Sequence, residues 1–266
     1  MSTIISLQNP QIKELVKLQK KHYRDQVDRF VIEGERETAR AIEQGVVIEK
    51  IFLSKTNLKI SIIGAERAIP IFELSEKAFE KVCYRENPDG VIAIAKKNHY
   101  TQKDLEKVLQ ALKKGIFLIC VGIEKPGNLG SMLRSADAAG AEGIILCDPH
   151  LDLFNPNVVR ASMGTLFSVP VYRADSKDVM LLLKQYGVQV IAATPHEAEN
   201  YTSIRYAPKV AVAMGKEQTG LTPFWIEQAD RAALIPMKGL ADSLNVANAA
   251  TLFLYEIVRQ HDTSAL

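Results

Sequence analysis

Three short segments place charged and amide side chains beside glycines, each directly after an apolar run. They are PGNLGSMLRSADAAG (126–140) with Asn128 and Arg134, GKEQTGL (215–221) with Glu217, and IPMKGLADSLN (235–245) with Ser243 and Asn245. Each alone has an ordinary explanation: a capped helix with a surface arginine, a tight turn with a solvated glutamate, and a plain helix cap. It is much less common for all three ordinary explanations to hold when three such segments meet at one place. We therefore interpret the segments as one functional site.

Familiar nucleotide and metal motifs do not account for these segments. The first loop spaces Gly122, Gly127 and Gly130 differently from G-x-G-x-x-G, and Leu221 stands where a Walker A motif needs its phosphate-binding lysine. The histidines form no metal-ligand cluster with each other or with cysteines; they are His22, His99, His150, His196 and His261. We therefore expect no metal, no P-loop and no ordinary dinucleotide fold.

Composition indicates a globular protein whose net charge is too small to attract nucleic acid by itself. The 266 residues are 47% hydrophobic and 24% charged, with a net charge of +2, so an RNA partner would need a local basic patch. Cys83, Cys120 and Cys147 are far apart and fit a reducing compartment as inert core thiols. No signal core and no apolar run of about 18 residues is present, so we expect a cytoplasmic protein that does not span a membrane.

The elements around the site predict an α/β fold with two domains. Residues 1–97 read as a small α/β unit with a helix over 10–22, and residues 98–113 read as a linker. In 114–266, strands at 115–122, 143–147, 188–194, 209–215 and 232–237 alternate with helices at 128–140, 176–186, 222–229 and 244–260. This alternation predicts a parallel sheet with helices on both faces.

The three polar segments each follow one of these strands. Parallel strands bring their carboxyl ends to one edge, where such sheets bind ligands. Asn128 is expected to cap the helix after the first strand, and Arg134 to point from its second turn toward the strand ends. The sequence thus predicts a single polar site at one sheet edge.

With these residues in place, the chain resembles a known family. The patterns Asn128-x-Gly130-x-x-x-Arg134, Gly215-x-Glu217-x-x-Gly220-Leu221 and Ile235-Pro236-Met237 with Ser243-Leu244-Asn245 are similar to the three motifs of the SpoU (TrmH-type) RNA ribose 2′-O-methyltransferases of the SPOUT superfamily. The segment 155–171 also fits, and the N-terminal part resembles the substrate-binding domain of one branch. The resemblance implies an RNA substrate-binding domain, a knotted methyltransferase domain at 114–266 and a C-terminal trefoil knot.

The resemblance also implies a cofactor and roles for the site residues. S-adenosyl-L-methionine would be held by Gly215, Ile235 and Leu244, mainly through backbone groups, with Met214, Met237 and Asn245 close by. Arg134 is the implicated catalytic residue; because a guanidinium is a poor base, we expect it to fix the target phosphate and stabilise the developing alkoxide. Asn128, Glu217, Ser243 and Asn245 would complete the hydrogen-bonding shell.

RNA contact and dimerisation are further expectations. Lys13, Lys17, Lys20, Lys21 and Arg24 fall on one face of the first helix, and Arg160 lies in the segment between the first two motifs; a solvated helix face is the alternative.

The last helix is apolar on more than one side, which favours a homodimer over burial within one chain. The extra N-terminal domain favours 23S rRNA; tRNA, a non-catalytic RNA-binding protein and an unrelated α/β transferase are the competing interpretations.

Overall fold

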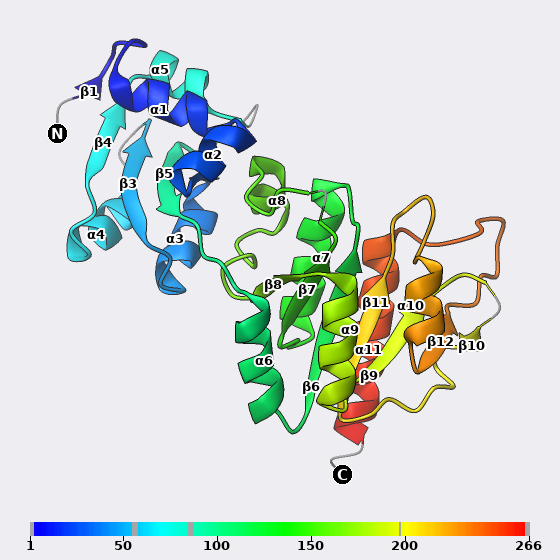
Figure 1. Cartoon of the computed structure of the whole chain (residues 1–266). Helices are drawn as coiled ribbons and strands as arrows, with labels where there is room; N and C mark the ends of the chain where they lie inside the picture. Colours follow the sequence, from blue (N-terminus) through cyan, green and yellow to red (C-terminus); the bar gives the residue numbers. More distant parts are fainter. Residues whose placement is uncertain (1–2, 55–57, 85–87, 150, 197, 264–266) are drawn as a thin grey trace. The chain divides into compact units, whose positions relative to one another are not determined.

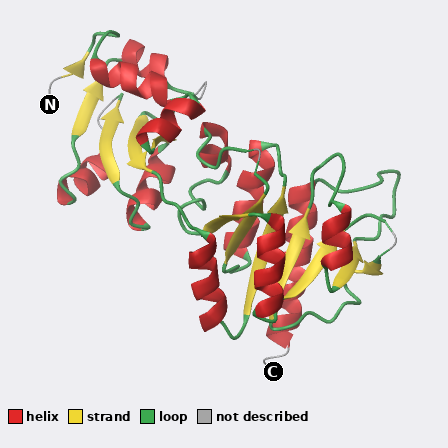
Figure 2. Ribbon diagram, viewed as in Figure 1, coloured by secondary structure: helices red, strands yellow, loops and turns green. Residues whose placement is uncertain are grey.

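The computed structural model describes residues 3–54, 58–84, 88–149, 151–196 and 198–263. By its internal packing the chain divides into two compact units (Figures 1 and 2). The first comprises Met1–Asn98 and Asp152–Ser168, and the second comprises His99–Leu151 and Val169–Leu266. His150 lies outside the described residues, as does the start of ENPDG (86–90), whose composition is typical of a turn.

The first unit is a mixed α/β fold. Its sheet has the order β1-β4-β3-β5-β2, in which β5 runs antiparallel to both of its neighbours and the other pairs are parallel. Its elements are β1 (Thr3–Ile4), α1 (Pro10–Leu18), α2 (Lys21–Val27), β2 (Arg29–Glu33), α3 (Glu35–Glu43), β3 (Ile48–Leu53), α4 (Leu58–Glu66), β4 (Ile71–Leu74), α5 (Glu76–Val82), β5 (Val91–Lys96) and α8 (Pro156–Ala161).

The helix predicted over residues 10–22 is instead two helices. Asn9 caps α1 by accepting a hydrogen bond from the Gln11 N–H at 2.9 Å, and Ile12 and Leu15 are buried on its inner face. Lys20 then adopts an extended backbone conformation and precedes α2. Neither glycine nor proline marks this break, so nothing local in the sequence indicated it.

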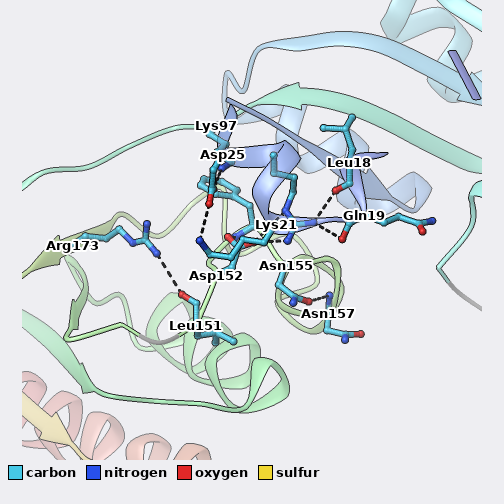
Figure 3. A network of polar contacts seen from close by, with 12 residues as sticks. Leu18, Gln19, Lys21, Asp25, Lys97, Leu151, Asp152, Asn155, Asn157 and Arg173 are labelled. Carbon is cyan, nitrogen blue, oxygen red and sulfur yellow. Dashed lines mark hydrogen bonds and ion pairs between the residues drawn. The ribbon is translucent and has the colours of Figure 1, made fainter. Parts of the chain in front are cut away.

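Helix α8 belongs by packing to the first unit, although its residues follow strand β7 (Gly143–Cys147) of the second. The Phe154 ring lies 4.7 Å from that of Phe30, measured between centroids. Arg24 and Asp152 form a nearly fully buried ion pair, with 2.5 Å between Nη2 and Oδ2. Figure 3 shows the polar network around Asp152. The chain segment that connects two strands of the second unit's sheet is therefore part of the core of the first unit.

The second unit contains a seven-stranded sheet of order β10-β12-β9-β11-β6-β7-β8, and every pair in it is parallel, as predicted. Its elements are α6 (Gln102–Ala111), β6 (Gly115–Val121), α7 (Pro126–Ala138), β7 (Gly143–Cys147), β8 (Val171–Ala174), α9 (Ser176–Gln185), β9 (Gln189–Ala193), β10 (Glu199–Asn200), β11 (Lys209–Met214), α10 (Pro223–Gln228), β12 (Arg231–Leu234) and α11 (Val246–Thr263).

Helices cover both faces of this sheet. Leu105 of α6, Val179 of α9 and Trp225 of α10 share one buried cluster, whereas α7 and α11 pack together on the opposite face (Figure 1). Helix α6 falls within the predicted linker, yet its buried leucines place it in the second unit. Within the described residues, no helix combines the length and apolar character that crossing a membrane requires.

Candidate functional site

The three polar segments leave strands β6, β11 and β12 at their carboxyl ends. Strands β6 and β11 are direct neighbours, and only β9 separates β11 from β12. Because all the pairs are parallel, the loops that follow these strands emerge at the same edge. The predicted convergence of the segments is therefore built into the strand order.

A directional chain of hydrogen bonds joins the three segments. The Asn245 Oδ1 accepts from the Ala247 N–H at 2.9 Å, so its Nδ2 is free to donate to the Asn128 Oδ1 at 3.1 Å. Asn128 in turn donates through Nδ2 to the Glu217 carboxylate. An ionised carboxylate only accepts, so this last bond fixes the orientation of the Asn128 amide.

Helix α7 begins earlier than the sequence predicted. Pro126 occupies the first turn, where its missing N–H costs nothing, and Lys125 is the N-cap. Asn128 therefore lies inside the first turn and does not cap the helix; its side chain reaches Glu217 instead. The same shift moves Arg134 from the second turn to the third.

The turn after β11 requires glycine at its start. A Cβ on Gly215 would lie 2.2 Å from the carbonyl carbon of Gly220 and 2.3 Å from the Leu221 nitrogen, both backbone atoms. The turn closes through hydrogen bonds of 3.1 and 2.9 Å between Lys216 and Gly220. Met214 ends the preceding strand and is buried. This tight turn places the Glu217 side chain within hydrogen-bonding distance of Asn128.

A second contact between the same two loops was not predicted. The Lys216 Nζ lies 3.4 Å from the Glu124 carboxylate. The Lys216 stem crosses Gly122, where a Cβ would meet the Lys216 Cε at 2.7 Å and where φ is +63°. Only the glycine at the end of β6 signalled such a close approach.

The third segment leaves its main chain available to a ligand. Ile235, Pro236 and Met237 are half-buried, and the residues from 238 to 245, Leu244 included, are exposed. Within the described residues, no backbone hydrogen bond engages residues 235–244. Half-buried apolar side chains beside unpaired main-chain donors and acceptors fit the requirements of an adenosine group.

Two predicted site residues do not join the hydrogen-bonded chain. Arg134 is exposed on α7, and Ser243 is exposed just before α11. Within the described part of the chain, neither side chain makes a hydrogen bond or ion pair. Arg134 is thus a cation with its donors available.

The basic residues predicted to contact RNA divide into two groups. Lys13, Lys17, Lys20, Lys21 and Arg160 are exposed. Arg24 is only 1% exposed and donates to the Leu18 and Gln19 carbonyls, each at 2.7 Å, as well as to Asp152. The break after α1 turns Arg24 inward, so its placement in an exposed stripe is wrong.

No group of potential metal ligands occurs among the described residues. Burial raises the pKa of Cys147 to about 12 and that of Cys120 further. Both thiols therefore remain protonated, which agrees with their assignment as core residues.

One edge of this parallel sheet combines a glycine turn, an unpaired backbone segment and a hydrogen-bonded polar cluster. This combination is typical of an α/β enzyme that binds a nucleoside-containing cofactor. The SpoU rRNA Methylase family matches residues 115–255, and the MRM3-like substrate binding domain matches residues 9–93. The chain belongs to the SpoU rRNA Methylase family.

Individual relatives match nearly the whole chain. A Bacillus subtilis protein, 23S rRNA (guanosine(2553)-2′-O)-methyltransferase RlmP, is 32% identical over 97% of this chain and 99% of its own. A crystal structure of an RNA 2′-O ribose methyltransferase is 38% identical, covers 98% of this chain and 99% of its own, and has a TM-score of 0.83. An AdoMet-bound rRNA methyltransferase from Sinorhizobium meliloti is 31% identical over 98% of each chain, with a TM-score of 0.86.

These matches confirm the predicted family, fold class, cofactor and type of reaction. The chain is an S-adenosylmethionine-dependent RNA ribose 2′-O-methyltransferase. The trefoil knot is implied by family membership.

Proposed function

We propose that this chain methylates a ribose 2′-hydroxyl in 23S rRNA. The observation that carries the proposal is the hydrogen-bonded chain from Asn245 through Asn128 to Glu217, which joins all three family motifs at one sheet edge. The substrate follows from the Bacillus subtilis relative, whose match includes the substrate-binding domain. Methylation of tRNA instead of 23S rRNA is the competing outcome.

The polar cluster positions the acceptor nucleotide. S-adenosylmethionine supplies an electrophilic methyl group on its sulfonium. The unengaged guanidinium of Arg134 fixes the phosphate of the target nucleotide and stabilises the negative charge that develops on its 2′-oxygen. Asn128 and Glu217 are held by each other, so they offer a preorganised surface, and Ser243 adds a hydroxyl at the same edge.

The turn after β11 and the segment after β12 would hold the cofactor. Gly215, Ile235 and Leu244 would bind its adenosine mainly through their backbone groups, with Met214, Met237 and Asn245 close by. The close backbone approach at Gly215 and the unpaired main chain of 235–244 support this placement.

The catalytic assignment is tested at Arg134. Arg134→Ala abolishes methyl transfer from labelled S-adenosylmethionine to 23S rRNA but preserves S-adenosylhomocysteine binding in calorimetry. An Arg134→Ala protein with activity close to wild type would refute the assigned role. Mapping methylated riboses in cells with and without the gene identifies the nucleotide, and a missing methyl group on tRNA with 23S rRNA unchanged would refute the substrate.

Four exposed lysines at the junction of α1 and α2, together with Arg160, contact the RNA backbone. Lys13, Lys17 and Lys20 are exposed around the junction of α1 and α2, and Lys21 follows them with an ion pair to Asp25 at 2.7 Å. Neutralisation of phosphates by such residues releases counterions, so RNA affinity falls with added salt.

The protein is a cytoplasmic homodimer that pairs through α11. Leu252 and Tyr255 of this helix are 39% and 47% exposed, while Phe253 and Leu254 are buried within the chain. A second copy would cover the exposed pair. Sedimentation is expected to show a dimer that Leu252→Glu dissociates; a wild-type monomer at micromolar concentration would refute this state.

A further inference from the structure

Lys216 occupies a position beside the reaction site that its structural contacts do not fully explain. It precedes Glu217 in the turn after β11, and both side chains reach the loop that follows β6. Glu217 meets Asn128 in the first turn of α7, and Lys216 meets Glu124 in the loop just before that helix. Two neighbouring interactions thus connect these segments. One is a hydrogen bond between a neutral amide and a carboxylate, and the other is an ion pair.

The ion pair itself contributes little to stability. Its N–O distance of 3.4 Å is long for a charge-assisted hydrogen bond, and the side chains of Lys216 and Glu124 are 36% and 53% exposed. Exposed pairs of this kind typically contribute almost nothing to the free energy of unfolding, because water screens them. The ammonium has three donors, and within the described residues Glu124 is its one charged partner.

The lysine stem, in contrast, packs closely against the backbone of the neighbouring loop. It lies across Gly122 so closely that a Cβ there would sit 2.7 Å from Cε and 3.3 Å from Cγ. Fixing the stem in advance lowers the entropic cost of using the ammonium for binding. Lys216 therefore presents a positive charge that is already in position, and an incoming anion can replace Glu124 as its partner.

We propose that Lys216 binds a backbone phosphate of the RNA at the target nucleotide, and that Glu124 holds the ammonium in place until the RNA arrives. This inference rests on the proposed function. A ribose that presents its 2′-hydroxyl to the Asn128–Glu217 cluster carries its own 3′-phosphate beside it. Without Lys216, that phosphate would meet the negative charge of Glu124, so the lysine both attracts the RNA and shields it from repulsion.

Two variants separate this role from a purely structural one. Both remove the ion pair, but only one of them removes the ammonium group. Lys216→Met keeps an apolar stem over Gly122; it is expected to weaken RNA binding roughly tenfold and to lower the salt slope by about one. Glu124→Gln frees the ammonium, so RNA binding equals or exceeds that of wild type. Filter binding of a 23S rRNA transcript, with S-adenosylhomocysteine present and at several salt concentrations, measures both effects.

The matched control is Lys107→Met, which removes another exposed lysine of the second unit from a 3.2 Å pair with Asp104; its RNA binding should equal wild type. Equal losses of RNA binding in Lys216→Met and Glu124→Gln would overturn the proposal, because the pair would then act only as a fastener. A loss of S-adenosylhomocysteine affinity in Lys216→Met that matched its loss of RNA affinity would also overturn it, since the lysine would then serve the cofactor carboxylate.

The binding measurement does not depend on turnover. Methyl transfer by the wild-type protein to the same transcript tests the proposed function separately. A protein that bound the transcript with the expected Lys216 dependence but did not methylate it would contradict the proposed substrate and still support the phosphate contact.

Discussion

Removing Arg24 would break the buried contact that ties the 152–168 segment into the first unit. The guanidinium donates to Asp152 through Nε at 3.1 Å and Nη2 at 2.5 Å, and to two carbonyls at the end of α1. Arg24→Ala would leave the carboxylate of Asp152, whose side chain is 8% exposed, with the Phe154 N–H as its one remaining donor among the described residues. The variant is therefore expected to destabilise α2 and α8 together.

The size of the loss follows from the burial of both partners. Deleting one member of a buried pair typically costs about 3 to 5 kcal/mol, because the remaining charge stays desolvated. Replacing both, as in Arg24→Met with Asp152→Leu, removes the stranded charge and should recover part of this loss. A coupling free energy of roughly 1 to 3 kcal/mol between the two positions is expected.

Hydrogen exchange measured by mass spectrometry can locate the effect, since it reports the free energy of opening segment by segment. Peptides from α2 and α8 should lose protection by a similar free energy in Arg24→Ala. The sole tryptophan, Trp225, is buried in the second unit. Its fluorescence in urea therefore reports that unit separately and should change less.

Two results would contradict this reasoning. A loss below about 1 kcal/mol would mean that water or a rearranged side chain replaces the guanidinium easily. A loss confined to α2, with α8 protected as in wild type, would mean that the pair does not hold the 152–168 segment.

Three further perturbations test separate parts of the structure. Gly215→Ala forces a Cβ into the backbone of its own turn, so S-adenosylhomocysteine affinity in calorimetry should fall by more than about tenfold. Hydrogen bonds from Lys21 and Lys97 lower the pKa of Asp25 to about 2 from 3.8, so its stabilising effect is present above pH 3.8 and is lost as the pH falls through about 2. The difference in thermal midpoint between wild type and Asp25→Asn should shrink over that interval. Charge reversal of Lys17 and Lys20 should weaken RNA binding and flatten its salt dependence.

Matched variants show what would contradict these expectations. Gly127→Ala meets no atom within 4 Å, so an equal loss of cofactor affinity there would exclude the steric explanation at Gly215. A constant difference in midpoint for Asp25→Asn across the acidic range would contradict the assigned pKa. Lys77→Glu reverses an exposed charge on α5, and an equal effect on RNA binding would mean that only net charge matters.

Periodicity was enough to predict five strands of the second unit, whose central members are continuous apolar runs typical of strands buried on both faces. Burial of every residue in β6 agrees with this. The short edge strands β8 and β10 were not predicted. The convergence of Asn128, Glu217 and Asn245 followed from the rule for parallel sheets and from the motif resemblance. Their hydrogen bonds cross 89 and 117 positions, so no local pattern could have supplied them.

The errors in the first unit have a common physical origin. Arg24 lies among lysines in a polar helical pattern, and its burial depends on pairing with a carboxylate 128 positions away. The interruption at Lys20 likewise has no breaker residue and depends on tertiary packing. The position of α8 depends on the contact between Phe154 and Phe30, which local sequence patterns do not encode.

The 152–168 segment limits how this chain can be divided. A fragment that starts near residue 99 would keep every strand of the seven-stranded sheet but lose the partners of Phe154 and Asp152. An aromatic ring and a carboxylate that are shielded in the intact chain would then face water in the middle of the fragment. Exchanging the substrate domain between relatives therefore requires moving this segment with it, as a second, non-contiguous piece of the gene.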